Sequence, residues 1–318
     1  MNKTALTNRH DFLILFEVTN GNPNGDPDAG NMPRFDPNTN KGLVSDVCLK
    51  RKIRNYIELF PPARTSAEEN GFNILIKQGA VIETEQKKGI EAAKQLHKEK
   101  DKQAEATMRW LCREFFDVRT FGGVLSTGDD VMKGSAWGQV RGPAQFTFGQ
   151  SFHPVNPLEI TMTVCAARLE GKPIEQQTGI QGHKYIVPYA LYAAKGYVSP
   201  AFAERTGFTQ ADLDLLFEAL LHMFEHDRSA ARGEMVVRGL YDFEHVGTQH
   251  ENNAEQNRRE ARLGCAHAHM LFDGIKVELT DEARSKGFPE SFADYRVICD
   301  WDDKPLPAGV RLHKRHEI

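Results

Sequence analysis

The sequence lacks the patterns that mark several common classes of protein. Its five cysteines are odd in number, widely spaced and free of any C-x-x-C pair. This usage predicts neither a disulfide framework nor a structural zinc site, and it favours a reduced cytoplasmic protein. The apolar run at residues 12–18 is too short for a signal sequence or a membrane span. With 40 Lys and Arg against 44 Asp and Glu, the net charge is −4. A nucleic-acid site would therefore have to be a local groove rather than a basic coat.

The usual catalytic and cofactor motifs are also missing. No G-x-x-x-x-G-K-[ST] sequence occurs, and the KGS at residues 133–135 has the wrong order for a P-loop. No G-x-G-x-x-G follows a predicted strand, and no G-x-S-x-G elbow is present. We therefore predict no cofactor.

Two histidine clusters could hold a metal, but each has an ordinary alternative. Cys265, His267 and His269 alternate, so on a strand they would share a face, although a fourth ligand is missing. His222 and His226 lie one helical turn apart without forming H-E-x-x-H. Packing in the first case and a helix surface in the second are the competing interpretations, and we predict no metal site.

The most informative stretch begins with a long polar loop. Residues 20–30 read NGNPNGDPDAG, and the loop continues through Arg34 to Lys41. Asn, Gly, Pro and Asp form turns and tolerate positive φ, and so polar a loop inside a domain is typical of a binding segment. Asp26 and Asp28 could bind a divalent ion or act as a base near RNA, or they could simply form turns.

A two-faced helix is predicted at residues 44–59, with Ser45 as its N-cap. Five basic residues against one acid give residues 41–55 a local charge of +4. The pattern places Lys50, Arg51 and Arg54 opposite an apolar stripe formed by Leu49, Ile53, Tyr56 and Phe60. The basic face could be an ordinary solvated surface. Beside the Asn-rich loop, it also suits a sugar-phosphate chain.

The order of predicted elements indicates an α+β fold. Strands are expected at residues 12–18, 158–168, 184–194 and 235–245, and a second helix begins at the N-cap Thr209, with Asp212 completing a capping-box variant. Together with the first helix this is β-α-β-β-α-β, the ferredoxin-like (RRM-like) arrangement of many RNA-binding domains. Residues 61–156 are predicted to form an inserted lobe. The segment after residue 245 is predicted to wrap around the surface and to end in a basic tail.

Three arginines stand close to glycine-containing turns. Arg119, Arg141 and Arg238 could each clamp a phosphate beside an exposed backbone turn. Each could equally be a structural partner of Asp117 or Asp242.

Four separate motifs resemble those of one family. They are NPNGDP at residues 22–27, DVRTFG at 117–122, RGPAQF at 141–146 and RGLYDF at 238–243. In this order, and with the basic first helix, they resemble the hand-shaped backbone subunit of the CRISPR-associated Cascade surveillance complex, closest to subtype I-C. The resemblance covers nearly the whole chain.

The resemblance implies a palm, fingers and a thumb. The ferredoxin-like palm would be residues 1–60 and 157–318, the fingers 61–156, and the protruding hairpin thumb about 169–183. On the thumb, Lys172, Ile174 and Ile180 would wedge and clamp. The implied RNA-binding set is Asn22, Asn24, Arg34, Lys41, Lys50, Arg51, Arg54, Arg119, Arg141, Gln145, Lys172, Lys184 and Arg238.

The function implied by the resemblance is structural. Such subunits polymerise along a guide RNA, hold its phosphates and leave its bases free to pair with target DNA in antiviral defence. The implied partners are copies of the same chain, the guide RNA, target DNA, and the large, RNA-processing and nuclease-helicase components. The alternative is a ribonuclease of the same ferredoxin-like group, with Asp26 or a histidine as its catalytic group.

Overall fold

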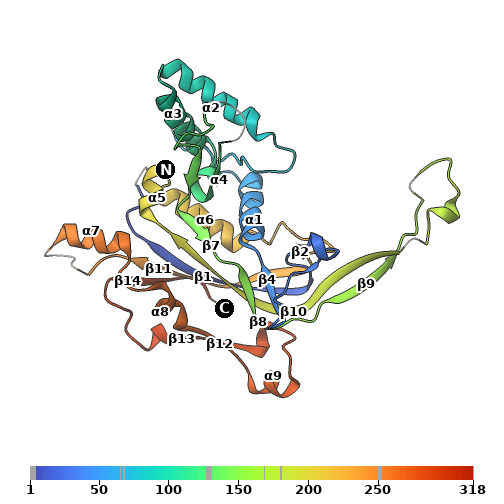
Figure 1. Ribbon diagram of the computed structural model, residues 1–318. Coiled ribbons are helices and arrows are strands. Elements are labelled where there is room, and N and C mark those ends of the chain that lie inside the picture. The colour runs from blue at the N-terminus through green and yellow to red at the C-terminus, as the bar shows by residue number, and fades with distance from the viewer. Residues whose placement is uncertain are drawn as a thin grey trace.

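Figure 1 shows the computed structural model of the chain. Residues 5–64, 66, 69–126, 131–167, 169–179, 181–248 and 253–317 are described. A broad sheet crosses the middle of the molecule, a helical lobe stands above it in this view, and a thin arm projects to one side. None of the helices in these described ranges has both the length and the apolar character of a membrane span.

The central sheet is antiparallel and eight-stranded. Its main path runs β14-β11-β1-β10-β8-β4, and β7 and β9 also pair with β10. The strands are β1 (His10–Gly21), β4 (Lys41–Val44), β7 (Ala144–Phe146), β8 (Gly149–Pro154), β9 (Leu158–Thr163), β10 (Gln181–Val198), β11 (Glu234–His245) and β14 (Val310–Glu317).

Strand β1 lies between β10 and β11 and is buried from His10 to Val18, so the predicted central strand is confirmed. Its alternate side chains enter two different cores. Phe12 and Phe16 belong to the core on the helical face, and Leu13 and Leu15 to the core on the other face. Both faces of the strand are covered, and this explains the continuous apolar run from Phe12 to Phe16.

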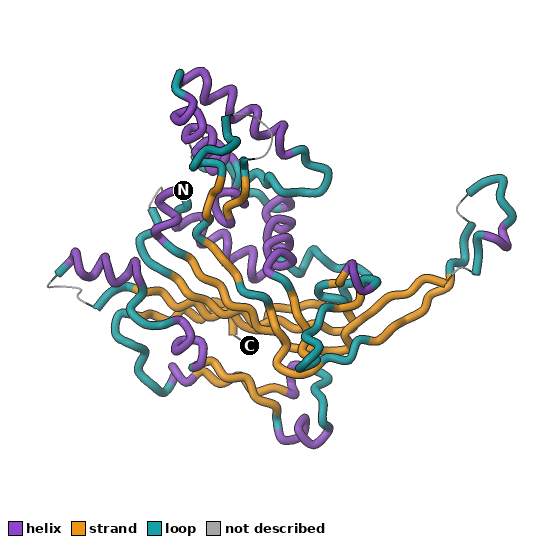
Figure 2. Tube along the Cα trace, viewed as in Figure 1, coloured by secondary structure: helices purple, strands orange, loops and turns teal. Residues whose placement is uncertain are grey.

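Helices α1 (Asp46–Leu59), α5 (Pro200–Thr206) and α6 (Gln210–His222) cover one face of the sheet (Figure 2). Phe217 on α6 meets Phe12 edge to face, with ring centroids 5.4 Å apart. Both predicted caps are present: the Ser45 side chain caps α1, and Thr209 and Asp212 form a capping box at α6.

The C-terminal part of the chain covers the opposite face. It comprises α7 (Ala254–Leu263), α8 (Ala268–Asp273), β12 (Ile275–Leu279), α9 (Asp281–Lys286) and β13 (Tyr295–Cys299). Leu271 and Phe272 of α8 pack there with Tyr241 and Phe243 of β11. The expected basic tail is instead β14, which pairs with β11 and widens the sheet.

The helical lobe has its own core. It contains α2 (Ile82–Leu96), α3 (Lys100–Glu114), α4 (Phe116–Phe121), β5 (Gly122–Val124) and β6 (Gln139–Arg141), and its buried cluster includes Leu75, Ile90, Met108 and Leu111.

Two features mark where this lobe meets the sheet. Gly122 has φ +76°, and a Cβ there would lie 2.2 Å from the carbonyl oxygen of Val140, so only glycine allows β5 and β6 to approach this closely. Strands β7 and β8 lie within the sequence range 61–156 yet pair with the central sheet.

The projecting arm is a two-stranded hairpin formed by β9 and the first third of β10 (Figure 1). Leu158 pairs with Ile186 at its base, and Thr163 pairs with Gln181 near its tip. The arm therefore begins well before the predicted start of the thumb at residue 169. Ile180 lies outside the described residues.

Strand neighbours β11–β1, β1–β10 and β10–β9 are all antiparallel. The fold is thus a mixed α+β arrangement built on a large antiparallel sheet. Strands β4, β7, β8 and β14 extend it beyond the four strands that the sequence pattern predicts.

Candidate nucleic-acid interface

The loop before α1 is fastened to the helix by Asn24. Its Oδ1 accepts hydrogen bonds from the backbone N–H and the hydroxyl of Ser45, each at 2.8 Å. The amide of Asn22, which is buried, donates to the carbonyl of Asn31 at 2.7 Å. The sequence predicts that Asn22 and Asn24 contact phosphates, but in the structure both amides bond within the protein and shape the loop.

Two cations of α1 are buried and paired. Arg54 donates to Asp117 at 2.9 Å, with its side chain 9% exposed and the carboxylate fully buried. Asp117 also accepts the backbone N–H groups of residues 75 and 76. Lys52 pairs with Asp227, and burial lowers the pKa of Lys52. The expectation that Arg54 lies on a solvated face is therefore wrong, since α1 packs that side against the helical lobe.

Lys50 stands at a point where three segments meet. Its Nζ donates to Asp46 at 3.0 Å and to Gln145 at 3.3 Å, and it lies 5.8 Å from the centroid of the Phe121 ring. Gln145 in turn donates to the carbonyls of Phe121 and Gly142. Helix α1, the end of α4 and strand β7 are thereby joined. The DVRTFG motif was the only sequence signal for Phe121.

Two large exposed apolar side chains lie on α1 and on the residue before β8. Val47 on α1 is 66% exposed and Phe148 is 55% exposed. Phe148 precedes Gly149, which pairs with Val44 just before α1. Within the described residues, the one hydrogen bond of the Arg51 side chain is a long one, 3.4 Å, to the carbonyl of Ile76. We call Val47, Lys50, Arg51, Gln145 and Phe148 the α1 surface. It combines cationic, amide and apolar groups that can contact phosphate, sugar and base.

Arg119 is not available to a ligand in this structure. Its side chain is fully buried and donates to Asp212 at 2.7 Å. It also donates to the carbonyls of Cys112, Arg113 and Gly71. The prediction that Arg119 clamps a phosphate assumes that its side chain is exposed beside a turn. This assumption is wrong, because the guanidinium group is buried and donates four hydrogen bonds to other groups of the protein.

Arg238 and Arg141 occupy different surroundings. Arg238 is half-buried, pairs with Glu17, and lies 4.8 Å from the Phe292 ring. Arg141 is exposed and lies 5.2 Å from the Phe202 ring of α5. The ring contacts of these two arginines are therefore with Phe292 and Phe202 and not with a residue of the α1 surface.

Lys41 lies on the edge strand β4, half-buried. Burial, followed by the charge of Lys41, lowers the pKa of His153 on the neighbouring strand β8. Lys41 forms no ion pair within the described part of the chain.

The arm carries an apolar stripe on one face. Leu158, Ile160 and Met162 alternate along β9 and are 50%, 42% and 39% exposed. Lys184 pairs with Ile160 across the hairpin, and Lys172 is exposed near the tip. Leu169 and Ile174, farther along the arm, are further large apolar side chains that are exposed.

A family model described as CRISPR-associated protein Cas7 matches residues 8–300. The chain belongs to the Cas7 family. The matched region runs from the start of β1 past β13 and stops short of β14. The resemblance found in the sequence motifs is thereby confirmed at the level of the family; its subtype is not decided by this match.

One curated relative supports the same assignment. This Cas7-family chain is 28% identical over 228 residues to the CRISPR-associated protein Cas7 of Haloferax volcanii. The aligned region is 66% of this chain and spans 62% of the length of that relative.

Two solved structures show a weak likeness to this chain. A chain of a structure titled CRISPR RNA-guided surveillance complex, pre-nicking, has a TM-score of 0.44 at 12% identity, over 74% of this chain and 78% of that one. A second surveillance complex gives 0.42 at 15% identity, over 74% and 68%. TM-scores this low assign no function to the Cas7-family chain.

The catalytic and metal candidates of this Cas7-family chain have ordinary structural partners. Asp26 caps a short 3-10 turn and pairs with Arg34 at 3.2 Å. His222 stacks on Tyr56, with ring centroids 6.2 Å apart. Among the described residues, no group of three or more His, Cys, Asp or Glu could hold a metal ion.

Residues 265–269 do not form a strand, the arrangement in which Cys265, His267 and His269 would share a face. This segment leads into α8, where the rings of His267 and His269 stack with centroids 5.7 Å apart. The backbone N–H of Cys265 donates to His245 Nδ1 at 2.9 Å. The three side chains therefore do not share a strand face.

Proposed function

We propose that this Cas7-family chain is a non-catalytic backbone subunit of a type I Cascade complex, closest to subtype I-C. In this role it polymerises along a guide RNA in the cytoplasm and presents the RNA bases for pairing with target DNA. Its partners are further copies of itself, the large subunit, the RNA-processing subunit and the nuclease-helicase.

Family membership together with the α1 surface carries this proposal. The chain is acidic overall, yet Lys50 and Arg51 follow the exposed Val47 by about one turn of α1. Lys50 is held in place by Asp46 and Gln145, so its position is fixed before any ligand arrives. Such a surface favours contact with the RNA backbone over reading of its sequence.

We assign the parts of the hand as follows. The sheet with α1 and α6 is a ferredoxin-like palm, since the antiparallel neighbours β11, β1, β10 and β9 suit the β-α-β-β-α-β order. The lobe of α2, α3 and α4 is the fingers, and the arm of β9 and β10 is the thumb. The proposed guide contacts are Arg34, Lys41, Lys50, Arg51 and Gln145 on the palm, and Lys172 and Lys184 on the thumb.

The direct test is purification from cells that express a guide array. We expect a raised ratio of nucleic-acid to protein absorbance, a single length of RNA, and a particle much larger than the 35.8 kDa chain. A monomer with a clean protein spectrum, obtained even when the other subunits are co-expressed, would contradict the proposal.

The alternative function is an RNA-cleaving enzyme that uses Asp26. In the structure this carboxylate is engaged by Arg34 and caps a turn, which favours a structural role. Incubation with guide precursor and with complementary RNA, with and without magnesium, distinguishes the two functions. Metal-dependent cleavage that disappears in Asp26→Ala would establish the enzyme.

A further inference from the structure

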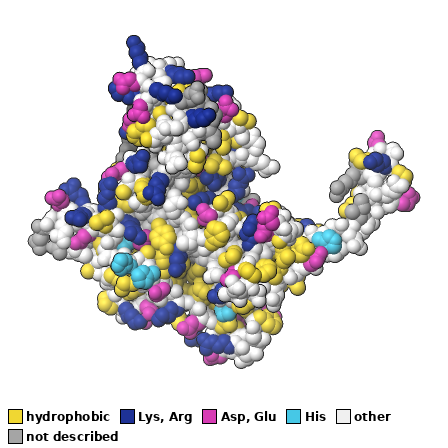
Figure 3. Space-filling view, in the orientation of Figure 1, with side chains coloured by type: hydrophobic (Ala, Val, Ile, Leu, Met, Phe, Trp, Pro, Cys, Tyr) yellow, Lys and Arg dark blue, Asp and Glu magenta, His cyan; other side chains and the backbone are white. Residues whose placement is uncertain are grey.

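A second basic surface lies on the side of β7 away from α1. It is formed by exposed arginines of α5 and α7: Arg205, Arg258, Arg259 and Arg262. Figure 3 shows Lys and Arg side chains gathered over these two helices. We call these four residues the arginine surface.

The two helices are held together firmly. Arg262 of α7 bonds both carboxylate oxygens of Glu204 on α5. At the end of α7, Arg9 donates to the carbonyl of Leu263 at 2.9 Å. These contacts fix the surface without using the remaining three guanidinium groups.

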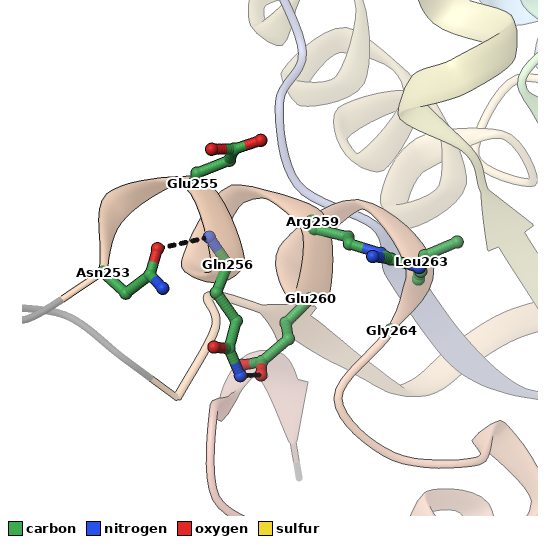
Figure 4. A pocket seen from close by; sticks show the side chains of 7 residues that line it. All are labelled: Asn253, Glu255, Gln256, Arg259, Glu260, Leu263 and Gly264. Carbon is green, nitrogen blue, oxygen red and sulfur yellow. Dashed lines mark hydrogen bonds between the residues drawn. The ribbon is translucent and has the colours of Figure 1, made fainter.

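Arg205, Arg258 and Arg259 form no ion pair in the described part of the chain, whereas most of its other arginines do. The acidic residues of α7, Glu255 and Glu260, form no ion pair with these arginines in the described part of the chain. Glu260 accepts from Thr248 and Gln256, and Figure 4 shows Gln256 and Glu260 extending together while Arg259 points away from them. These cations are therefore left for a ligand from outside.

The chemistry of the surface suits a phosphate backbone. Guanidinium groups bind phosphate in a bidentate manner, and all the cations here are arginines. Surfaces for single strands also present exposed aromatic rings for stacking. Leu263 is the only large apolar side chain of α5 or α7 that is strongly exposed among the described residues. A surface of cations without stacking rings favours a duplex, whose bases are already stacked.

We propose that the arginine surface binds the phosphate backbone of double-stranded nucleic acid, separately from the guide RNA at the α1 surface. This inference rests on the proposed function, because it assigns a second nucleic-acid contact to the same subunit. Arg141, which stacks on Phe202 of α5, lies beside this surface.

The test is a triple variant, Arg205→Gln, Arg258→Gln and Arg259→Gln, in the full chain purified with its guide RNA. The control is Lys98→Gln, Lys100→Gln and Arg296→Gln, which removes the same charge from exposed residues without ion pairs elsewhere in the described chain. The probe is a labelled random-sequence DNA duplex, titrated at several salt concentrations.

We expect the triple variant to bind the duplex more weakly and to lose about 0.9 units of log–log salt slope for each phosphate contact removed. The control should bind as the parent does, and both variants should retain guide RNA. Equal duplex binding by all three proteins would overturn the proposal. Loss of guide RNA from the triple variant alone would also overturn it, because the arginines would then belong to the guide site. Failure of the parent to carry any guide RNA is a separate result that contradicts the proposed function instead.

Discussion

Arg119 and Asp212 form an ion pair of 2.7 Å in which the two side chains are 0% and 2% exposed. Arg119 comes from α4 of the helical lobe and Asp212 from the first turn of α6 on the sheet. The second oxygen of Asp212 also accepts the N–H and hydroxyl of Thr209 in the capping box. One carboxylate thus joins α4 of the helical lobe to α6 and caps that helix.

Asp212→Ala should therefore be strongly destabilising. It leaves a guanidinium buried without its counter-ion, a change that costs about 3–5 kcal/mol in comparable cases. Denaturant unfolding measures the loss. Asp214→Ala, at an exposed position on the same helix, is the matched control and should stay within about 0.5 kcal/mol of the parent. Equal stability of the two variants would show that the pair does not hold the lobe.

Reversing the two cations of the α1 surface should release guide RNA. The variant Lys50→Glu with Arg51→Glu removes two cations and adds two acids where we propose that phosphates bind. We expect lower RNA retention and a salt slope reduced by about 0.7 units for each lost contact with a single strand. Lys98→Glu with Lys100→Glu, on the lobe, is the control. If both variants retain as much guide RNA as the parent, the α1 surface is not part of the RNA interface.

Arg54 should behave differently from its neighbour Arg51. Arg54→Ala leaves the buried carboxylate of Asp117 without a charged partner, so we expect a clear loss of stability, of about 3 kcal/mol or more. Arg51→Ala, at a more exposed position of the same helix, should unfold almost as the parent does. Thermal or denaturant unfolding of the two variants decides this. A similar small effect in both would mean that Arg54 is solvated after all.

Asn24→Ala should loosen the loop before α1. The change removes two hydrogen bonds to Ser45, and an unsatisfied buried group costs about 1–3 kcal/mol. Hydrogen exchange should become faster in the loop and in the first turn of α1. Asn38→Ala, at an exposed position in the same loop, should leave exchange unchanged. Protection that survives in Asn24→Ala would show that this side chain does not fasten the loop.

The attachment of β14 should depend on pH. Burial would raise the pKa of Asp242, but the bonds from His10 and Arg315 outweigh it and hold the pKa below the ordinary value of 3.8. A lowered folded-state pKa stabilises the fold above that ordinary value, and the contribution is lost as pH falls toward the folded pKa. Asp242→Asn should therefore be less stable than the parent at pH 7, and the gap should narrow below about pH 4. Asp281→Asn, 96% exposed, is the control. A difference in the free energy of unfolding between Asp242→Asn and the parent that stays constant across this pH range would show that the pKa of Asp242 is not lowered in the folded protein.

The sequence by itself determined the features that depend on near neighbours. The cap of α1 and the capping box of α6 join residues three positions apart, so they can be predicted from the pattern. The polar loop could likewise be predicted from its residue types. Asn20, Asn31 and Asn40 have positive φ, which asparagine tolerates better than most residues. An unbroken apolar run was enough to predict the central strand β1.

Only the tertiary structure decided which polar groups remain free. Arg54 and Arg51 look alike in the sequence, yet Arg54 meets Asp117 across 63 positions of chain and is buried. Asn24 looked like a ligand for phosphate and turned out to hold Ser45. Strand β14 carries so many basic residues that it resembled a loose tail, but Arg311 and Arg315 pair with Glu244 and Asp242 of β11. The physical reason is the same in each case: a charge or an amide acts on a ligand only if the fold has not already given it a partner, and distant partners leave no local pattern in the sequence.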